Sequence, residues 1–166
     1  SATNSKTVTI TGSALKDANK LYSILGSVAT SSETTLTIST KQELINFRDR
    51  VNAGETELNV ELSSDIDLEG SENNQWVTIK EYGGTFNGKA FTISNLYINN
   101  TENEDNLAFI NTLNNGIIKN VRIIGNVSGS KNIAIICVNN IDGIITNCIT
   151  EGLLTSKNIS TYTPTN

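Results

Sequence analysis

The sequence predicts an all-β protein, a right-handed parallel β-helix (solenoid) of about four coils with an N-terminal α-helical cap. Three observations indicate this fold: a short phrase containing asparagine recurs along the chain, a second asparagine column recurs beside it, and one amphipathic helix precedes both. The 166 residues are enough for one domain with a sizeable core. We expect this domain at residues 35–166, after an N-terminal segment or linker at 1–34.

The recurring phrase reads ISNLYI at 93–98, IKNVRI at 118–123 and ITNCIT at 145–150. Successive copies begin 25 and then 27 residues apart, which suits a solenoid with one repeat per coil. A straight strand sends alternate side chains to opposite faces, so it would put Asn95 inside and Leu96 outside. We therefore expect the chain to bend at the asparagine, which tolerates a left-handed backbone better than most residues.

Stacked coils would place these asparagines above one another, so that each side-chain amide bonds to the next in a ladder. In the earlier segment VELSSDIDL at 60–68, an aspartate occupies the same corner and would accept a hydrogen bond from the amide of the following coil. The predicted ladder consists of Asp65, Asn95, Asn120 and Asn147. The second column repeats every 26 residues and consists of Asn106, Asn132 and Asn158.

The segment TKQELINFRDRVNAG at 40–54 predicts the helical cap. Thr40 and Glu43 have the spacing of a capping box, and Gly54 is placed to end the helix. One face of this helix carries the apolar residues Leu44, Phe47 and Val51. A solenoid exposes unpaired strand edges at its ends, so we expect the helix to cover the edge of the first coil.

The N-terminal segment shows weaker patterns. Residues 7–12 (TVTITG) are consistent with a strand, and residues 14–25 with an amphipathic helix that ends near Gly26. The stretch ATSSETT at 29–35 is typical of a linker. The polar start SATNSK fits a mature protein whose signal peptide has been removed, which predicts a secreted or cell-surface location.

Composition argues against several classes of function. The chain has no histidine, the commonest general base and zinc ligand, and we expect neither a metal nor another cofactor. Its net charge of -5, with scattered basic residues, argues against a nucleic-acid partner. No apolar run approaches the ~20 residues needed to span a membrane.

The two cysteines, Cys137 and Cys148, lie outside any CxxC pattern and have no companion histidine. Cys148 falls where Leu96 and Val121 fall in the other copies of the phrase, so we interpret it as a small buried hydrophobe. A disulfide between the two cysteines is the alternative, and two cysteines alone do not decide between these interpretations.

Two consecutive stretches, GGTFNGKAFTISNLYINN at 83–100 and DNLAFINTLNNGIIKNV at 105–121, resemble the GLUG repeats of bacterial surface proteins. Those repeats usually run GTFDGNGHTISNLYI, then NVGLFG, then GGTIKNV. The resemblance extends over residues 36–160 and implies a repeat module of an adhesin-like, secreted or surface-anchored protein. The chain departs from the pattern at the glycines of the name-giving motif, where it has Ala108, Asn111, Ala134 and Cys137.

The acidic stretch DIDLEG at 65–70 suggests two kinds of chemistry. It resembles the opening of a helix-loop-helix calcium loop, but the twelfth position, which needs a bidentate glutamate, is Trp76. Asp67 and Glu69 lie at about the separation of a glycosidase acid–base pair. A carbohydrate-active enzyme on a β-helix, a polysaccharide lyase or glycoside hydrolase, is therefore the alternative function. The simpler interpretation of these acids is the solvated face of a strand.

The alignment of the repeats stacks Asp67, Tyr97 and Arg122 in one column on the outer face of the coils. A tyrosine ring can stack on a sugar and a guanidinium can bond its hydroxyl groups, so this column is the candidate ligand site. The simpler interpretation is a ladder in which Arg122 pairs with its neighbours. The favoured function is a non-catalytic, adhesin-like interaction module that binds a glycan or a protein on a host or partner surface.

Two segments, NLAFI at 106–110 and NIAIIC at 132–137, are apolar on both faces. If alternate residues point inward, Ile110 and Ile136 lie outside, where a continuous apolar strand is normally covered. We therefore expect these two isoleucines to form an interface with either the helix at 14–25 or another chain. The sequence leaves the oligomeric state open.

Overall fold

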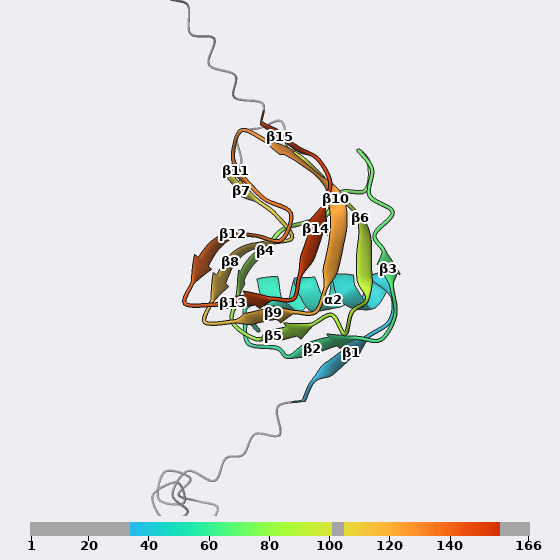
Figure 1. The fold of residues 1–166 in the computed structure, drawn as a ribbon, viewed down its shortest axis with the longest axis vertical. Coiled ribbons are helices and arrows are strands. Elements are labelled where there is room, and N and C mark those ends of the chain that lie inside the picture. The colour runs from blue at the N-terminus through green and yellow to red at the C-terminus, as the bar shows by residue number, and fades with distance from the viewer. Residues whose placement is uncertain (1–33, 101–104, 157–166) are drawn as a thin grey trace, which may run out of the picture. The chain divides into compact units, whose positions relative to one another are not determined.

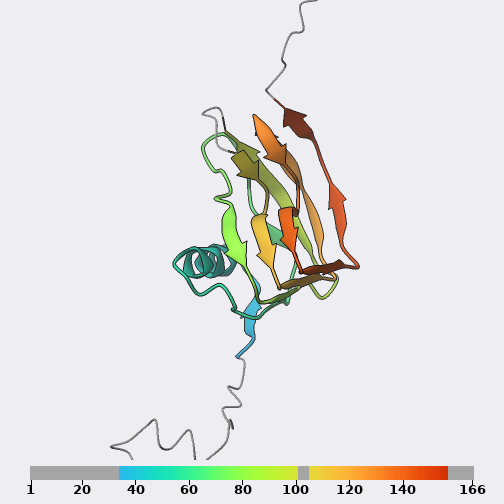
Figure 2. The ribbon, with the colours of Figure 1, turned by 90° about the vertical axis from the view of Figure 1, so that its left-hand side faces the viewer.

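The structure is a computed structural model, and it describes residues 34–100 and 105–156. Its strands wind into a parallel β-solenoid of about four turns with one helix at the N-terminal end (Figure 1). Figure 2 shows the turns advancing from the helix on one side to the last strands on the other. The predicted fold class is therefore confirmed. The expected strand at 7–12, the expected helix at 14–25 and Asn158 lie outside the described residues.

Three sheets run along the solenoid, and every pairing between their strands is parallel. The first sheet consists of β1 (Leu36–Ile38), β2 (Val60–Leu62), β5 (Thr85–Asn87), β9 (Ile117–Lys119) and β13 (Ile144–Thr146). The second consists of β3 (Ile66–Asp67), β6 (Thr92–Asn99), β10 (Arg122–Gly129) and β14 (Ile149–Glu151), and β15 (Leu154–Ser156) also pairs with β10. The third consists of β4 (Ile79–Tyr82), β8 (Ile110–Asn114) and β12 (Cys137–Ile141). A two-stranded ladder joins β7 (Asp105–Leu107) and β11 (Lys131–Ile133).

Helix α2 (Lys41–Asn52) closes the N-terminal end as the sequence predicts. Thr40 Oγ1 accepts a hydrogen bond from the Glu43 N–H at 3.2 Å, and Glu43 Oε2 accepts one from the Thr40 N–H at 3.1 Å. Gly54 follows the helix with a φ of 117°, a conformation that glycine adopts readily. The buried face of α2 packs against β4 and consists of Leu44, Phe47 and Val51. No helix among the described residues is long and apolar enough to cross a membrane.

A chain of aromatic side chains ties the helix to the first coils. Phe47 of α2 meets Tyr82 edge-on at 5.6 Å and Phe86 at 5.9 Å between ring centroids. Phe86 then meets Phe109 at 5.8 Å, and Trp76 stacks on Phe109 at 4.9 Å. The polar atoms of this cluster are satisfied, because the Trp76 Nε1–H donates to the Phe109 carbonyl at 3.1 Å. Burial also raises the pKa of Tyr82, which keeps its hydroxyl group protonated.

The asparagine corners are confirmed, but the ladder through them differs from the prediction. Asn95, Asn120 and Asn147 have φ values of 54°, 55° and 51°, so the backbone is left-handed at each. The Asn147 Nδ2 donates to Asn120 Oδ1 at 3.3 Å, and the Asn120 Nδ2 donates to Asn87 Oδ1 at 3.1 Å. Asn95 lies outside this ladder and donates to Asp67 Oδ1 at 2.8 Å. The prediction that Asp65, Asn95 and Asn120 share one ladder is therefore wrong.

The strand register explains this difference. Ile118 pairs with Phe86, and Ile123 pairs with Ile93. The chain therefore takes seven residues to pass this corner in one coil and five in the next. Asn95 lies beyond the corner, where the register of β6 against β10 is irregular. The 27-residue alignment of the second and third phrases is correct, because β9 pairs with β13 in that register.

The second asparagine column is confirmed where the structure describes it. Asn106 and Asn132 have φ values of 69° and 46°, and the Asn132 Nδ2 donates to Asn106 Oδ1 at 2.9 Å. This bond places one side-chain amide above the other across two coils, at the ladder formed by β7 and β11. Left-handed asparagines with stacked amides therefore occur at two separate corners of the solenoid.

The predicted outer placement of Ile110 and Ile136 is wrong. Ala108, Phe109 and Ile110 are all fully buried, because the chain bends at residues 108–109 between β7 and β8. The bend resets which side chains point inward, so Ile110 belongs to the core. Ile136 is partly buried against the same core. The core itself buries Ile110 and covers part of Ile136.

Both cysteines are half-buried free thiols, so no disulfide links them. Cys148 packs against the core cluster, which agrees with its interpretation as a small hydrophobe. Cys137 packs against the same cluster, and burial raises the pKa of its thiol. Both side chains therefore act as small apolar groups in this fold.

The amide ladder predicts a specific loss of stability for Asn120→Ala. This change removes both ladder bonds and places alanine in a left-handed conformation. Asn115→Ala is the matched control, because Asn115 has a φ of 56° but is exposed, and its side-chain amide donates to the adjacent Asn114 rather than to another coil. We expect Asn120→Ala to lower the free energy of unfolding by ~1 to 2 kcal/mol more than the control, measured by urea denaturation. Equal losses would show that the ladder bonds contribute nothing.

Candidate functional site

The three residues of the predicted ligand column do not stack. Asp67 of β3 pairs with Ser94, three residues before Tyr97. Arg122 of β10 pairs with Thr92, five residues before Tyr97. The sequence alignment of the repeats that misplaced the ladder also misplaced this column. The predicted stacking of Asp67, Tyr97 and Arg122 in one site is therefore wrong. Each residue therefore needs to be considered in its own surroundings.

Asp67 fixes a corner of the backbone. Its Oδ1 accepts hydrogen bonds from the Asn95 Nδ2 at 2.8 Å and from the Glu69 N–H at 2.7 Å. These two bonds, the one from Asn95 first, hold the pKa of Asp67 below its usual range. Glu69 forms an ion pair with Lys41 of α2 at 2.8 Å. A glycosidase needs a carboxyl with a raised pKa as its acid, and Asp67 has the opposite shift.

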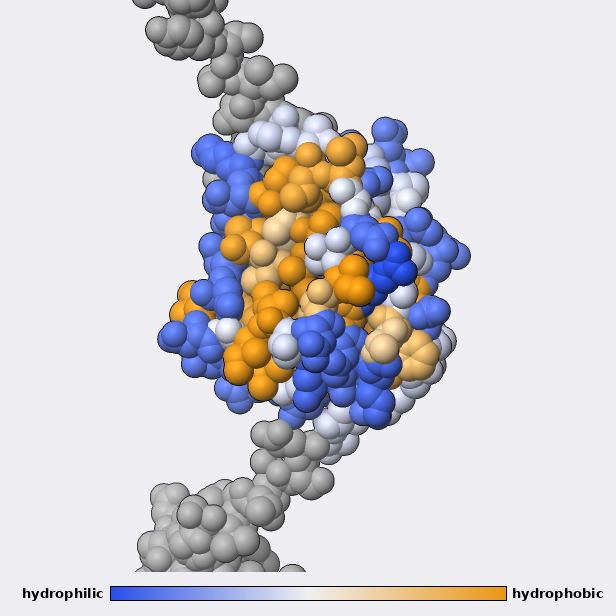
Figure 3. Space-filling view, in the orientation of Figure 1, coloured by the Kyte–Doolittle hydropathy of each residue, from blue (hydrophilic) through white to orange (hydrophobic). Residues whose placement is uncertain are grey.

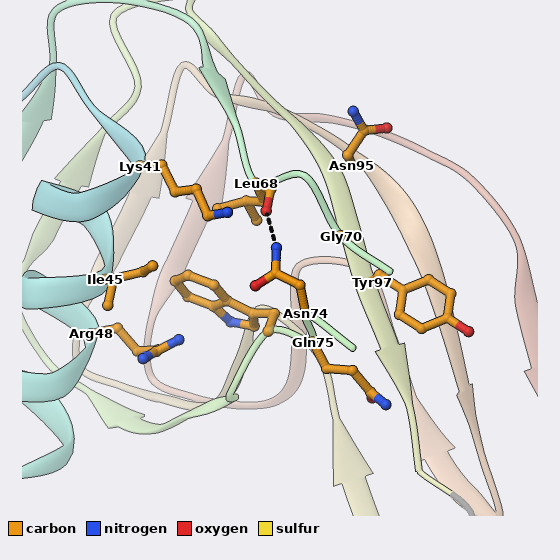
Figure 4. Close-up of a pocket in the computed structure, with 10 residues that line it drawn as sticks. Lys41, Ile45, Arg48, Leu68, Gly70, Asn74, Gln75, Asn95 and Tyr97 are labelled. Atoms are coloured by element: carbon orange, nitrogen blue, oxygen red, sulfur yellow. Dashed lines mark hydrogen bonds between the residues drawn. The ribbon is translucent and has the colours of Figure 1, made fainter. Parts of the chain in front are cut away.

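Tyr97 borders a small pocket under helix α2 (Figure 4). The guanidinium of Arg48 lies 5.0 Å from the Trp76 ring centroid, and the Asn74 Nδ2 donates to the Leu68 carbonyl at 3.0 Å. The enclosed space is about 20 Å³, which is room for roughly one water molecule. Figure 4 shows the Tyr97 ring turned away from the helix side chains. The residues that line this pocket hold α2 against the coils, and the pocket itself is too small for a ligand.

Arg122 lies in a larger hollow at the corner between the first and second sheets, which we call the corner depression. It has a volume of about 630 Å³. Its lining residues are Lys89, Ala90, Thr92, Asn120, Val121, Arg122, Asn147 and Ile149. The corner depression brings together one residue of the predicted ligand column and two residues of the predicted ladder. The structure thus assigns a shared location to residues that the sequence had placed in separate roles.

The corner depression combines cationic donors with an apolar floor. The Arg122 Nη2 donates to both carboxylate oxygens of Glu151, at 2.7 and 2.8 Å, and its side chain is 43% exposed. The Lys89 Nζ lies 3.4 Å from a Glu61 oxygen, and its side chain is 49% exposed. Exposed ion pairs of this kind are weak and exchange easily with other partners. Donors on both side chains therefore remain able to bond a ligand, above a floor that includes Ile149.

Lys89 was missed by the sequence analysis. It belongs to the turn Gly88–Lys89–Ala90, and Lys89 and Ala90 have left-handed φ values of 51° and 69°. This turn supplies the two additional residues of the longer corner. The signal was present in the spacing from Phe86 to Ile93, which is longer than its counterpart in the next coil.

The surroundings of Asp67 predict a pH-dependent contribution to stability. The folded pKa lies below the ordinary value of 3.8, so the ionised form stabilises the fold above that pH, and this contribution is lost as the pH falls through the folded pKa. Asp67→Asn keeps an acceptor oxygen but removes the charge. We expect the variant to unfold at a lower urea concentration than the wild type near pH 7. The difference in urea midpoint between the variant and the wild type should narrow below pH 3.8. A difference that does not change with pH would contradict this role of Asp67.

Comparison of the chain with protein-family models, with curated proteins and with solved structures gave no match. The resemblance to GLUG repeats therefore stays a prediction from sequence. Among the residues that the structure describes, no group of three or more histidine, cysteine, aspartate or glutamate side chains could hold a metal ion. The corner depression is the candidate site that the geometry supports best.

Proposed function

We propose that this chain is a non-catalytic, adhesin-like interaction module, secreted or displayed on a cell surface, that binds a glycan in the corner depression. The observation that supports this function is the composition of the depression, which joins cationic and amide groups to an apolar floor. Its volume of about 630 Å³ lies within the range of small-molecule sites.

The chemistry of a sugar matches these groups. Each sugar hydroxyl can donate and accept, so it can take hydrogen bonds from Arg122 or Lys89 and give one to the Asn147 amide oxygen. Asn147 is the last member of the amide ladder among the described residues, so its oxygen has no further described coil beside it. The C–H face of the ring would contact the exposed side chain of Ile149. A shallow site of this kind suits weak binding that repeated modules strengthen.

The location outside the cell rests on the sequence. The resemblance to GLUG repeats favours a secreted or surface protein. The alternative function, a carbohydrate-active enzyme, needs a proton donor beside the scissile bond. Asp67, the residue proposed for that chemistry, has a lowered pKa and is held by the corner it fixes. Binding without turnover is therefore the function we propose.

A glycan array followed by titration of the best ligand tests this function. We expect Arg122→Gln to weaken binding at least about tenfold, because the guanidinium is the most versatile donor in the depression. Arg50→Gln is the matched control, since Arg50 of α2 is 45% exposed and pairs with Glu55 as Arg122 pairs with Glu151. The control should leave both affinity and melting temperature unchanged.

Three results would reject the proposal. They are an array without hits, hits that Arg122→Gln leaves unchanged, and hits that the wild-type protein cleaves. Cleavage would be detected as new reducing ends when the bound glycan is incubated with the protein. Loss of that cleavage in Asp67→Asn would establish the enzyme instead.

A further inference from the structure

The last strands of the solenoid have edges that no described strand covers. Strands β12, β13 and β14 end their sheets, and β15 pairs only with β10. The Ile149 N–H donates to the Val121 carbonyl at 3.0 Å, toward the preceding coil. Successive N–H groups of a strand point in opposite directions, so that of Thr150 points to the open side. The same reasoning places the N–H of Ile145 on the open side, because the Ile144 N–H bonds to the preceding coil.

The same coil is apolar on its outer face, unlike the coils before it. Ile149 lies above the polar residues Thr92 and Arg122, and Leu153 lies above Asn126. Figure 3 shows apolar residues gathered across the end bounded by β12, β13, β14 and β15, which we call the C-terminal face. Its exposed large apolar residues are Ile141, Ile144, Ile145, Ile149, Leu153 and Leu154.

The C-terminal face also lacks the charges that usually protect a free edge. Residues 137–156 contain no lysine, arginine or proline, and their acidic residues are Asp142 and Glu151. Arg122 neutralises Glu151 through two hydrogen bonds. Natural proteins normally place lysine, proline or inward charges on exposed strand edges to prevent pairing with other chains. A nearly neutral edge without such residues is able to pair with another strand.

The opposite end differs from this face. Helix α2 packs against β4 there, and it presents exposed charged residues such as Asp49 and Arg50 to solvent. Head-to-tail stacking would press those charges and the helix backbone against open strand edges. A self-complementary arrangement, in which the same face is used by both partners, has no such obstacle.

We propose that the C-terminal face docks a second copy of this chain, tail to tail about a two-fold axis. The two-fold axis reverses the strand direction in the partner, so the edge strands meet antiparallel and their outward N–H and C=O groups pair. The low charge of the face lets two acidic chains approach without placing like charges in contact. The dimer does not rest on glycan binding in the corner depression, but Ile149 borders both surfaces, so the dimer would cover part of that depression.

The area is sufficient for such a dimer. The six exposed side chains are 37% to 63% accessible. Together they present on the order of 500 Å² of apolar surface, near the upper limit for a monomer. Two copies would bury on the order of 1,000 Å² from these side chains alone, and the strand edges add to this toward the ~1,200 Å² of a stable interface.

Sedimentation velocity of the 166-residue chain across concentrations from about 1 to about 200 µM tests the dimer. We expect a reversible dimer that Ile144→Lys weakens at least about tenfold, because it places an unpaired positive charge in the buried interface of each copy. Val77→Lys is the matched control, since Val77 is 56% exposed and Ile144 is 55% exposed. Val77 lies between β3 and β4, away from the C-terminal face, and the control should leave the dimer unchanged.

A second variant tests the strand edge itself. Thr150→Pro removes an N–H on the open side and keeps the bond from Ile149 to Val121, and edge positions tolerate proline in this way. We expect it to weaken the dimer while the thermal midpoint of the monomer stays close to that of the wild type. In wild-type hydrogen exchange, the amides of Ile145 and Thr150 should become protected only at concentrations where the dimer forms.

A chain that stays monomeric at every concentration would overturn the proposal. So would a dimer that resists both Ile144→Lys and Thr150→Pro. Protection of these amides in a monomer would show that another part of the same chain covers the face, and this too would overturn docking of a second copy.

Discussion

Parallel pairing between successive coils is the constraint on which the rest of this structure depends. Each strand must meet its neighbours in register, because a buried N–H or C=O without a partner is costly. Coils can therefore differ in length only at their corners, where the backbone leaves the ladder. Left-handed asparagines gather at those corners, and their amides bond from coil to coil as the strands do. The sheets and the amide ladders thus enforce the same distance between successive coils.

The architecture was predictable because it follows from features that are local in sequence. The capping box of Thr40 and Glu43 depends on a few neighbouring residues, and so do the left-handed asparagines. The repeat of about 27 residues is visible directly in the sequence as a recurring short motif. The vertical alignment of the first phrase was not predictable in this way. Matching letters placed Ile118 beside Ile93, whereas the strand pairing places Ile123 beside Ile93. A corner that is two residues longer changes the alignment without changing the motif.

The same longer corner accounts for the candidate site. Arg122, Asn120 and Asn147 were selected from sequence for reasons of stacking, and they meet in one hollow because the Gly88–Lys89–Ala90 turn opens the corner between two sheets. Lys89 had no motif to mark it. Trp76 also went unrecognised, since its contacts with Arg48 and Phe109 join segments far apart in sequence. Contacts of this kind depend on how coils stack, which a single sequence describes only indirectly.

The two ends of the solenoid meet one physical requirement in different ways. A strand that is apolar on both faces needs cover, and this rule was sound even though it was applied to Ile110 and Ile136. The bend at residues 108–109 turns Ile110 into the core, and Ile136 packs partly against the same core. In the last coil that the structure describes, the outer positions of Ile149 and Leu153 are apolar where earlier coils have polar residues. The N-terminal end uses a helix of the same chain as its cover. An apolar surface of this size at the other end, with little charge on it, is typical of a surface that binds another apolar surface.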